Sequence, residues 1–170
     1  MSGRWTIRPE GSNWGDFGPD DEYGRLNLLT REKVLQGIAE VKEGLTFCLS
    51  LPLNIPGGNV LNPLRHPPLL TAVRDEGGYP IVSENPMHTD IILDERMHLY
   101  SQYSSQWDAL AHIGSRFDAN GDGEPEHVYY NGHSAVPEQG MGSEDGRVGA
   151  QALGIEKTAE FGLQDRKSVV

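Results

Sequence analysis

The sequence has few of the residues that several classes of site require. Cys48 is the only cysteine among 170 residues, so an intrachain disulfide and a cysteine-rich zinc site are excluded. The 14 basic residues face 25 acidic ones, which gives a formal net charge of −11. Binding to a nucleic-acid backbone needs a concentrated basic face, and no Lys/Arg cluster supplies one. We therefore expect no nucleic-acid partner and a solvated acidic surface.

Long hydrophobic runs are also missing. The longest, such as Ile91–Leu93, are far too short to span a bilayer. Met1 to Trp5 contain no apolar signal-peptide core, so we expect a cytoplasmic protein without a membrane partner. Dinucleotide, phosphate-loop and Gly-x-Ser-x-Gly motifs are absent, which disfavours nucleotide binding and serine-hydrolase chemistry.

The composition indicates a folded domain with many loops. Hydrophobic residues make up 36% of the chain and charged residues 23%, which is typical of a globular protein. Glycine (21) and proline (11) are frequent and predict loops between short elements. Helical and strand-like patterns interleave, so we predict one mixed α/β (α+β) domain over residues 1–170.

Two helices and several strand-like pieces are predicted. Val34, Leu35, Ile38 and Val41 recur at helical spacing after a Thr30 cap, and Gly44 offers a left-handed stop. The alternation over residues 45–51 predicts a strand, in which Cys48 is an ordinary strand residue rather than a nucleophile. The other predictions are a long excursion (54–90), strand-like pieces (90–100), a loop (117–137) and a helix over 155–161 closed by Gly162.

The densest polar constellation lies between Gln102 and His112. In an extended segment Gln102, Gln106 and Asp108 project to one face, and a helix after Asp108 brings His112 back to it. An aspartate and a histidine beside amide side chains suit metal binding, water activation or the binding of a polar substrate. The alternative is an aspartate that caps a helix, with a hydrogen-bonded histidine one turn later. Trp107 points to the opposite face, where core packing is its simplest role.

This stretch resembles the motif of the cyclase family, which includes kynurenine formamidase-like, metal-dependent hydrolases. Without gaps, Asp108 aligns with the family aspartate and His112 with its final histidine, whereas Gln102 and Gln106 stand at two metal-binding histidines. Two further segments also resemble the family, Trp14–Gly15 with Asp20–Thr30 and Leu153–Leu163. The resemblance therefore extends in order along nearly the whole chain.

The resemblance implies a fold, a reaction and a set of site residues. The fold is a swivelling β/β/α-type domain. The reaction is hydrolysis of an amide C–N bond in a small aromatic or cyclic substrate, as in the arylformamidase step of tryptophan catabolism. Asp108, Gln102 and Gln106 would bind a divalent metal (zinc or manganese), and His112 would transfer the proton. Trp107 and Tyr130 would bind substrate, Tyr130 because Tyr129–Gly132 resembles a segment at the family's active-site mouth.

The sequence departs from the family at the metal site and at the end of the chain. A glutamine oxygen is a poorer ligand than imidazole, and a branch of the family carries glutamine at these positions, so metal binding stays open. Residues 164–170 do not match the family's continuation, from which we expect a C-terminally incomplete member that self-associates as a homodimer. The competing interpretation is a metal-free, non-catalytic small-molecule binding domain or an inactive fragment.

The remaining histidines and an acidic loop have simpler interpretations. His127 and His133 flank the Tyr129–Gly132 segment and are expected to be surface or hydrogen-bonded residues, although they could line the pocket. His66, His88 and His98 are interpreted as structural. Asp118–Gly123 matches the opening of a calcium loop, but Tyr129 occupies the position of the bidentate glutamate, which favours a plain turn.

Overall fold

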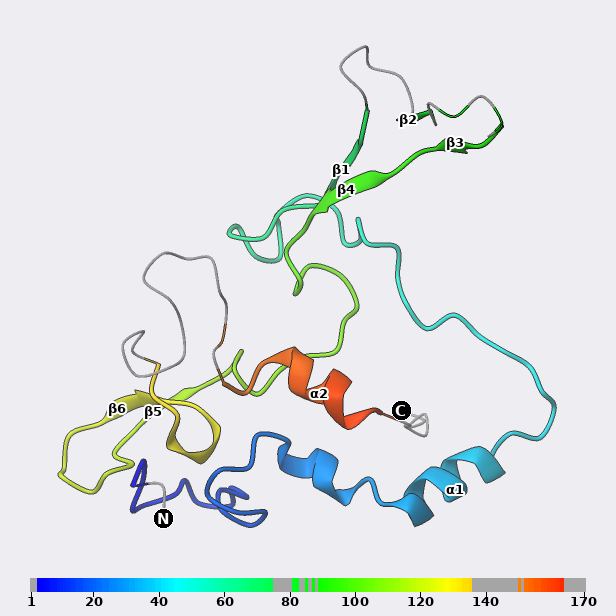
Figure 1. The fold of residues 1–170 in the computed structure, drawn as a ribbon. Helices are drawn as coiled ribbons and strands as arrows, with labels where there is room; N and C mark the ends of the chain where they lie inside the picture. The colour runs from blue at the N-terminus through cyan, green and yellow to red at the C-terminus, as the bar shows by residue number, and fades with distance from the viewer. Residues whose placement is uncertain are drawn as a thin grey trace. The chain divides into compact units, whose positions relative to one another are not determined.

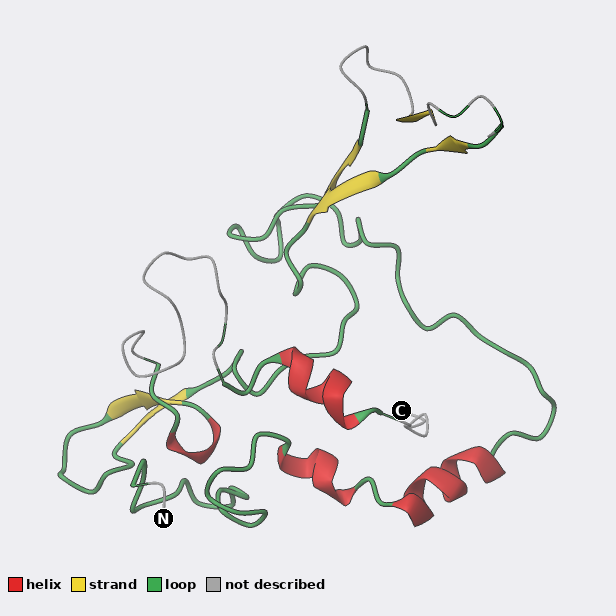
Figure 2. Cartoon of the chain, viewed as in Figure 1, coloured by secondary structure: helices red, strands yellow, loops and turns green. Residues whose placement is uncertain are grey.

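A computed structural model describes residues 3–74, 81–82, 85, 87, 89–135, 150 and 152–163. Short helices come first along the chain, short strands follow, and short helices end the described part, as Figures 1 and 2 show, so the predicted mixed α+β class is confirmed. In chain order the elements are η1 (Gly24–Leu28), α1 (Arg31–Ala39), β1 (Leu69–Ala72), β2 (Ile81–Val82), β3 (Ile91–Ile92), β4 (Glu95–His98), β5 (Ser115–Phe117), β6 (Glu126–Val128), η2 (Tyr130–Gly132) and α2 (Ile155–Phe161). No helix in these ranges is long and apolar enough to cross a membrane.

The chain divides into two compact units. The first unit joins Met1–Thr46 to Trp107–Val170 and contains all four helices of the described part, together with β5 and β6. The second unit, Phe47–Gln106, contains β1 to β4. Strands pair only within a unit among the described residues, so each unit has its own small sheets.

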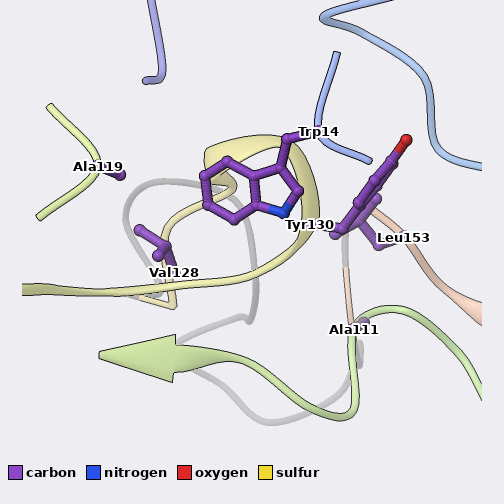
Figure 3. Packing of buried hydrophobic residues seen from close by; sticks show 6 residues of the cluster. All are labelled: Trp14, Ala111, Ala119, Val128, Tyr130 and Leu153. Atoms are coloured by element: carbon purple, nitrogen blue, oxygen red, sulfur yellow. The ribbon is translucent and has the colours of Figure 1, made fainter. Parts of the chain in front are cut away.

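The core of the first unit is small and is centred on Trp14. Figure 3 shows the Trp14 indole with Tyr130 and Leu153 on one side and Ala119 and Val128 on the other. The ring of Trp5 meets Trp14 edge-on, with ring centroids 5.9 Å apart. Burying such rings removes a large apolar area from water, so apolar packing contributes to holding the N-terminal segment against Val128 and Leu153.

A buried asparagine fixes the loop that carries Trp14. Asn131 is completely buried and has a positive φ of 53°, a conformation that asparagine tolerates better than most residues. Its Oδ1 accepts a hydrogen bond from the Gly15 amide at 2.8 Å. Its Nδ2 donates to the carbonyls of Gly18 (3.1 Å) and Asp21 (2.9 Å). One side chain therefore makes three hydrogen bonds to the backbone of residues 15–21.

The strands β5 and β6 form an antiparallel hairpin beside this core. Ser115 pairs with Val128, Arg116 with His127 and Phe117 with Glu126. Gly114 precedes β5 at a close approach of two backbones, since a Cβ there would lie 2.6 Å from the Val128 carbonyl oxygen. Glu126 accepts hydrogen bonds from the amides of Ala119 and Asn120, which ties the hairpin loop back to β6.

The second unit consists of two small antiparallel sheets and extended chain. β1 pairs with β4, with Leu69 opposite His98, and β2 pairs with β3. Side chains of residues 103–105 bind the backbone of residues 51–58, since Ser104 Oγ donates to Pro52 O and Ser105 Oγ accepts from Leu51 N. These bonds give Ser104 and Ser105 a structural role.

The predicted helices are found, but some of their boundaries differ. Thr30 caps α1 by accepting a hydrogen bond from the Lys33 amide, as predicted. The helix ends at Ala39, before Gly44, although Gly44 does have the expected positive φ of 66°. The second helix is confirmed over Ile155–Phe161, and Gly162 at its C-terminus has a φ of 72°.

Three other predictions of local structure are wrong. Residues 45–51 form no strand, because no segment of the described chain pairs with them, and Cys48 is exposed there. The chain after Asp108 makes a single turn rather than a helix, and the predicted loop over 117–137 contains β6 and η2. His88 and residues 164–170 lie outside the described residues.

Candidate functional site

Asp108 and His112 form a side-chain hydrogen bond across a tight turn. The His112 amide donates to the Ala109 carbonyl at 3.0 Å, and this bond closes the turn. His112 Nδ1 contacts Asp108 Oδ1, and both side chains remain accessible, with exposed fractions of 30% for His112 and 50% for Asp108. The turn has the same effect as the predicted helix, because it brings the carboxylate and the imidazole together.

The pairing assigns the proton on the His112 ring. The carboxylate lies much nearer to Nδ1 than does the Ala109 amide, which is 3.4 Å away. We therefore place the proton on Nδ1, from which it is donated to Asp108. Nε2 is then the ring nitrogen that can accept a proton from a reacting group. This is the arrangement that a carboxylate-oriented general base requires.

Two pockets of the first unit share Asp108 and Leu110. The first, which we call the tyrosine pocket, has a volume of about 470 Å³, and its wall includes Trp14, Ile113, Tyr129 and Tyr130. The second, the tryptophan pocket, has a volume of about 390 Å³, and its wall includes Tyr23, Arg25, Trp107 and Leu153. Both volumes lie in the range of small-molecule sites. Asp108 is therefore within reach of ligands on either side.

The two residues predicted to bind substrate lie in different pockets. Tyr130 lines the tyrosine pocket and also belongs to the buried core. Trp107 lines the tryptophan pocket with 61% of its surface exposed, so the alternative of core packing is wrong for this residue. The substrate roles of both residues remain predictions.

Gln102 and Gln106 belong to the second unit, whereas Asp108 and His112 belong to the first. The backbone carbonyl oxygen of Gln102 accepts a hydrogen bond from Arg65 Nη1 at 2.9 Å. Among the residues with defined positions, no three His, Cys, Asp or Glu side chains form a group that could hold a metal ion. Since amide oxygens are weak ligands for zinc or manganese, the donor set fits a tightly held metal poorly.

Several residues that support the site were not predicted as functional. Asp21 accepts hydrogen bonds from the Tyr130 hydroxyl (3.0 Å), the Gly24 amide (2.7 Å) and Asn27 Nδ2 (2.7 Å). Glu22 accepts a hydrogen bond from the Leu153 amide at 2.7 Å. These carboxylates come from the same N-terminal segment that carries the family resemblance. The segment therefore positions the walls of both pockets, a role that sequence spacing alone does not reveal.

Tyr130 is held as a neutral phenol. Burial raises the pKa of its hydroxyl far above the ordinary value, and the hydrogen bond to Asp21 and the negative charges of Asp21 and Asp16 raise it further. The hydroxyl proton is donated to Asp21. Tyr130 is thus suited to packing and to accepting a hydrogen bond from a ligand rather than to proton abstraction.

The other histidines agree with their simpler interpretations in most cases. His127 is exposed on β6, and the rings of His66 and His98 pack against Tyr100. His133 is half-buried, and its Nε2 has no hydrogen-bond partner among the residues described. The Asp118 loop is a turn, as predicted. The two carboxylate oxygens of Asp118 accept hydrogen bonds from the backbone amides of Gly121 and Gly123.

Comparison with solved structures shows a likeness to a cyclase. No family model matches the sequence, and no curated protein matches it. The fold is similar to a crystal structure of a novel cyclase, with a TM-score of 0.61 and 31% sequence identity over 86% of this chain. The chain spans 44% of the length of that protein. The likeness in sequence and fold supports the cyclase family, a family of enzymes, as the group that this chain resembles.

Proposed function

We propose that the protein is a cyclase-family hydrolase that cleaves an amide C–N bond in a small aromatic or cyclic substrate. The observation that carries the proposal is Asp108, which contacts His112 and lines two pockets of the size of small-molecule sites. The likeness to a cyclase is consistent with it. Arylformamidase activity, in which formate is released from an aromatic N-formyl amine, is the leading specific reaction.

The residues of the chain supply a simple sequence of proton transfers. His112 Nε2 accepts a proton from a water molecule, whose oxygen then attacks the substrate carbonyl carbon. Asp108 accepts the Nδ1 hydrogen bond and stabilises the imidazolium that forms. The C–N bond breaks when the imidazolium returns the proton to the leaving nitrogen. The products are a carboxylic acid and an amine, and His112 is neutral again.

A divalent metal is proposed on the family resemblance alone, with Asp108 as its charged ligand. Bound at this position, it would supply Lewis-acid activation of a water molecule or carbonyl. Because one carboxylate with amide oxygens is a weak donor set for such an ion, the proton transfers are assigned to Asp108 and His112 alone.

Hydrolysis of N-formylkynurenine by the freshly purified chain tests the proposal. Formate release is expected to exceed the rate in buffer, and metal content is measured on the same sample before and after dialysis against a chelator. Activity that survives chelation assigns the reaction to the Asp108–His112 pair, whereas activity lost with the metal restores the family's metal mechanism. A folded protein that releases no formate from this or related aromatic formamides contradicts the proposal and favours a non-catalytic binding domain.

A further inference from the structure

The tryptophan pocket has a positive charge that the proposed reaction does not use. Arg25 lies on its rim, on η1, and is exposed to solvent. Within the described part of the chain, no carboxylate or carbonyl forms an ion pair or hydrogen bond with its guanidinium group. An arginine side chain presents a planar array of donors that matches a carboxylate.

The two carboxylates of the same pocket already have partners. Glu22 accepts a hydrogen bond from the Leu153 amide, and Oε1 of Glu22 lies 3.6 Å from Lys157 Nζ. Asp108 pairs with His112. Within the described part of the chain, Arg25 is therefore the charged side chain of this pocket wall that has no partner, and a ligand with one negative charge complements it.

The remaining wall is aromatic and aliphatic. Tyr23 and Trp107 contribute rings, and Leu26, Leu110 and Leu153 contribute aliphatic surface. The Tyr23 ring packs against Phe161 of α2 with centroids 5.4 Å apart, so this part of the wall is fixed by the first unit itself. A volume of about 390 Å³ suits a ligand with one or two rings. Because a chain with a net charge of −11 repels free anions, the ring must supply much of the affinity.

We propose that the tryptophan pocket binds small aromatic carboxylates, with the ring against Tyr23 and Trp107 and the carboxylate on Arg25. Asp108 also borders this pocket. We therefore infer that the substrate belongs to the same class as the ligand, and this inference about the substrate rests on the proposed function. The substrate is then an aromatic acid whose amide bond lies near Asp108 and His112.

Binding of two fluorinated probes to the full chain, followed by ¹⁹F NMR, tests the site. 4-Fluorobenzoate carries the anion, and 4-fluorobenzyl alcohol is a neutral probe with the same ring. We expect wild type to bind the benzoate more tightly. Arg25→Gln should weaken benzoate binding about fivefold and leave the alcohol unchanged. Trp107→Leu should weaken both probes, and Arg31→Gln, an exposed arginine outside the pocket, should weaken neither.

Three results would overturn the proposal. They are equal affinity of wild type for the two probes, unchanged benzoate binding by Arg25→Gln, and loss of binding in Ile113→Ala, whose side chain lines only the tyrosine pocket. Neither probe contains an amide bond, so the probe experiment tests the binding site independently of the proposed hydrolysis. Absence of formate release with benzoate binding intact removes the proposed function and the substrate class but leaves the binding site standing.

Discussion

At the residue scale, Asn131 is the side chain on which the N-terminal segment depends most. Its three hydrogen bonds join the Gly15, Gly18 and Asp21 backbone to η2. We predict that Asn131→Ala lowers the free energy of unfolding by about 3 kcal/mol, roughly 1 kcal/mol for each hydrogen bond lost. Urea unfolding measures this loss. Asn59→Ala, at an exposed position with one long bond of 3.5 Å, is the matched control, and equal losses in the two variants would contradict the account.

His133 gives the stability of the protein a pH dependence. Burial is the main cause that lowers its pKa below the ordinary 6.5, and the nearby Arg4 charge adds to it, against the opposing effects of Glu22 and Asp20. The unfolded state therefore binds the proton more readily than the folded state. The contribution of neutral His133 to the free energy of unfolding is fully present above about pH 6.5 and is lost as the pH falls through the lower pKa of the folded state.

The corresponding variant is His133→Gln. Between pH 7.5 and pH 5, we expect its free energy of unfolding to fall less than that of wild type, because the group that takes up a proton on unfolding has been removed. Urea unfolding at several pH values measures both slopes. Identical pH dependence in the two proteins would show that His133 remains neutral or equally solvated in both states.

At the element scale, the β5–β6 hairpin tolerates no side chain at Gly114. A Cβ there would lie 2.6 Å from the Val128 carbonyl oxygen and 3.0 Å from the Tyr129 ring. We predict that Gly114→Ala separates the hairpin and lowers the free energy of unfolding by about 1–3 kcal/mol. Ser115→Ala, the neighbouring exposed position, is the control, and thermal unfolding compares the two. A Gly114→Ala protein as stable as wild type would contradict the close approach of the Gly114 and Val128 backbones.

The elements that the sequence predicts well are those fixed by local interactions. The Thr30 cap and the Gly162 terminus depend on residues within one helical turn, so both are found where they are expected. The strand over residues 45–51 requires a partner from elsewhere in the chain, which alternation cannot supply. The η2 turn escapes prediction for a similar reason, since its Asn131 conformation is held by residues more than a hundred positions away.

In the candidate site too, the local contact is predictable from the sequence and the long-range contacts are not. The spacing of Asp108 and His112 is enough to predict that they meet, because a single turn brings them together. The walls of the two pockets come from five separated segments, around residues 9–14, 22–29, 107–115, 128–130 and 153–163. No pattern in the sequence indicates that Arg25 and Trp107 line one pocket. The carboxylate–imidazole pair is therefore predictable from the sequence, and its surroundings are not.

At the scale of the whole molecule, self-association as a homodimer remains a proposal. Apolar side chains of the segment 47–51 are largely exposed, with exposed fractions of 77% for Phe47 and 70% for Leu49. A run of exposed alternating apolar residues favours pairing with another chain. We predict that wild type sediments as a dimer or larger species and that Phe47→Asp with Leu49→Asp shifts it toward monomer. A monomeric wild type at micromolar concentration would contradict this prediction.

The central claim is that Asp108 and His112 act together as one catalytic pair, and a double-mutant cycle tests it most directly. The quantity is kcat/KM for N-formylkynurenine in Asp108→Asn, His112→Asn and the double variant, each shown to be folded. We predict that each single change lowers kcat/KM by about 10²- to 10⁴-fold. The kcat/KM of the double variant should be no lower than that of the less active single variant. Wild-type rates in either single variant, or losses that multiply in the double variant, would contradict the account.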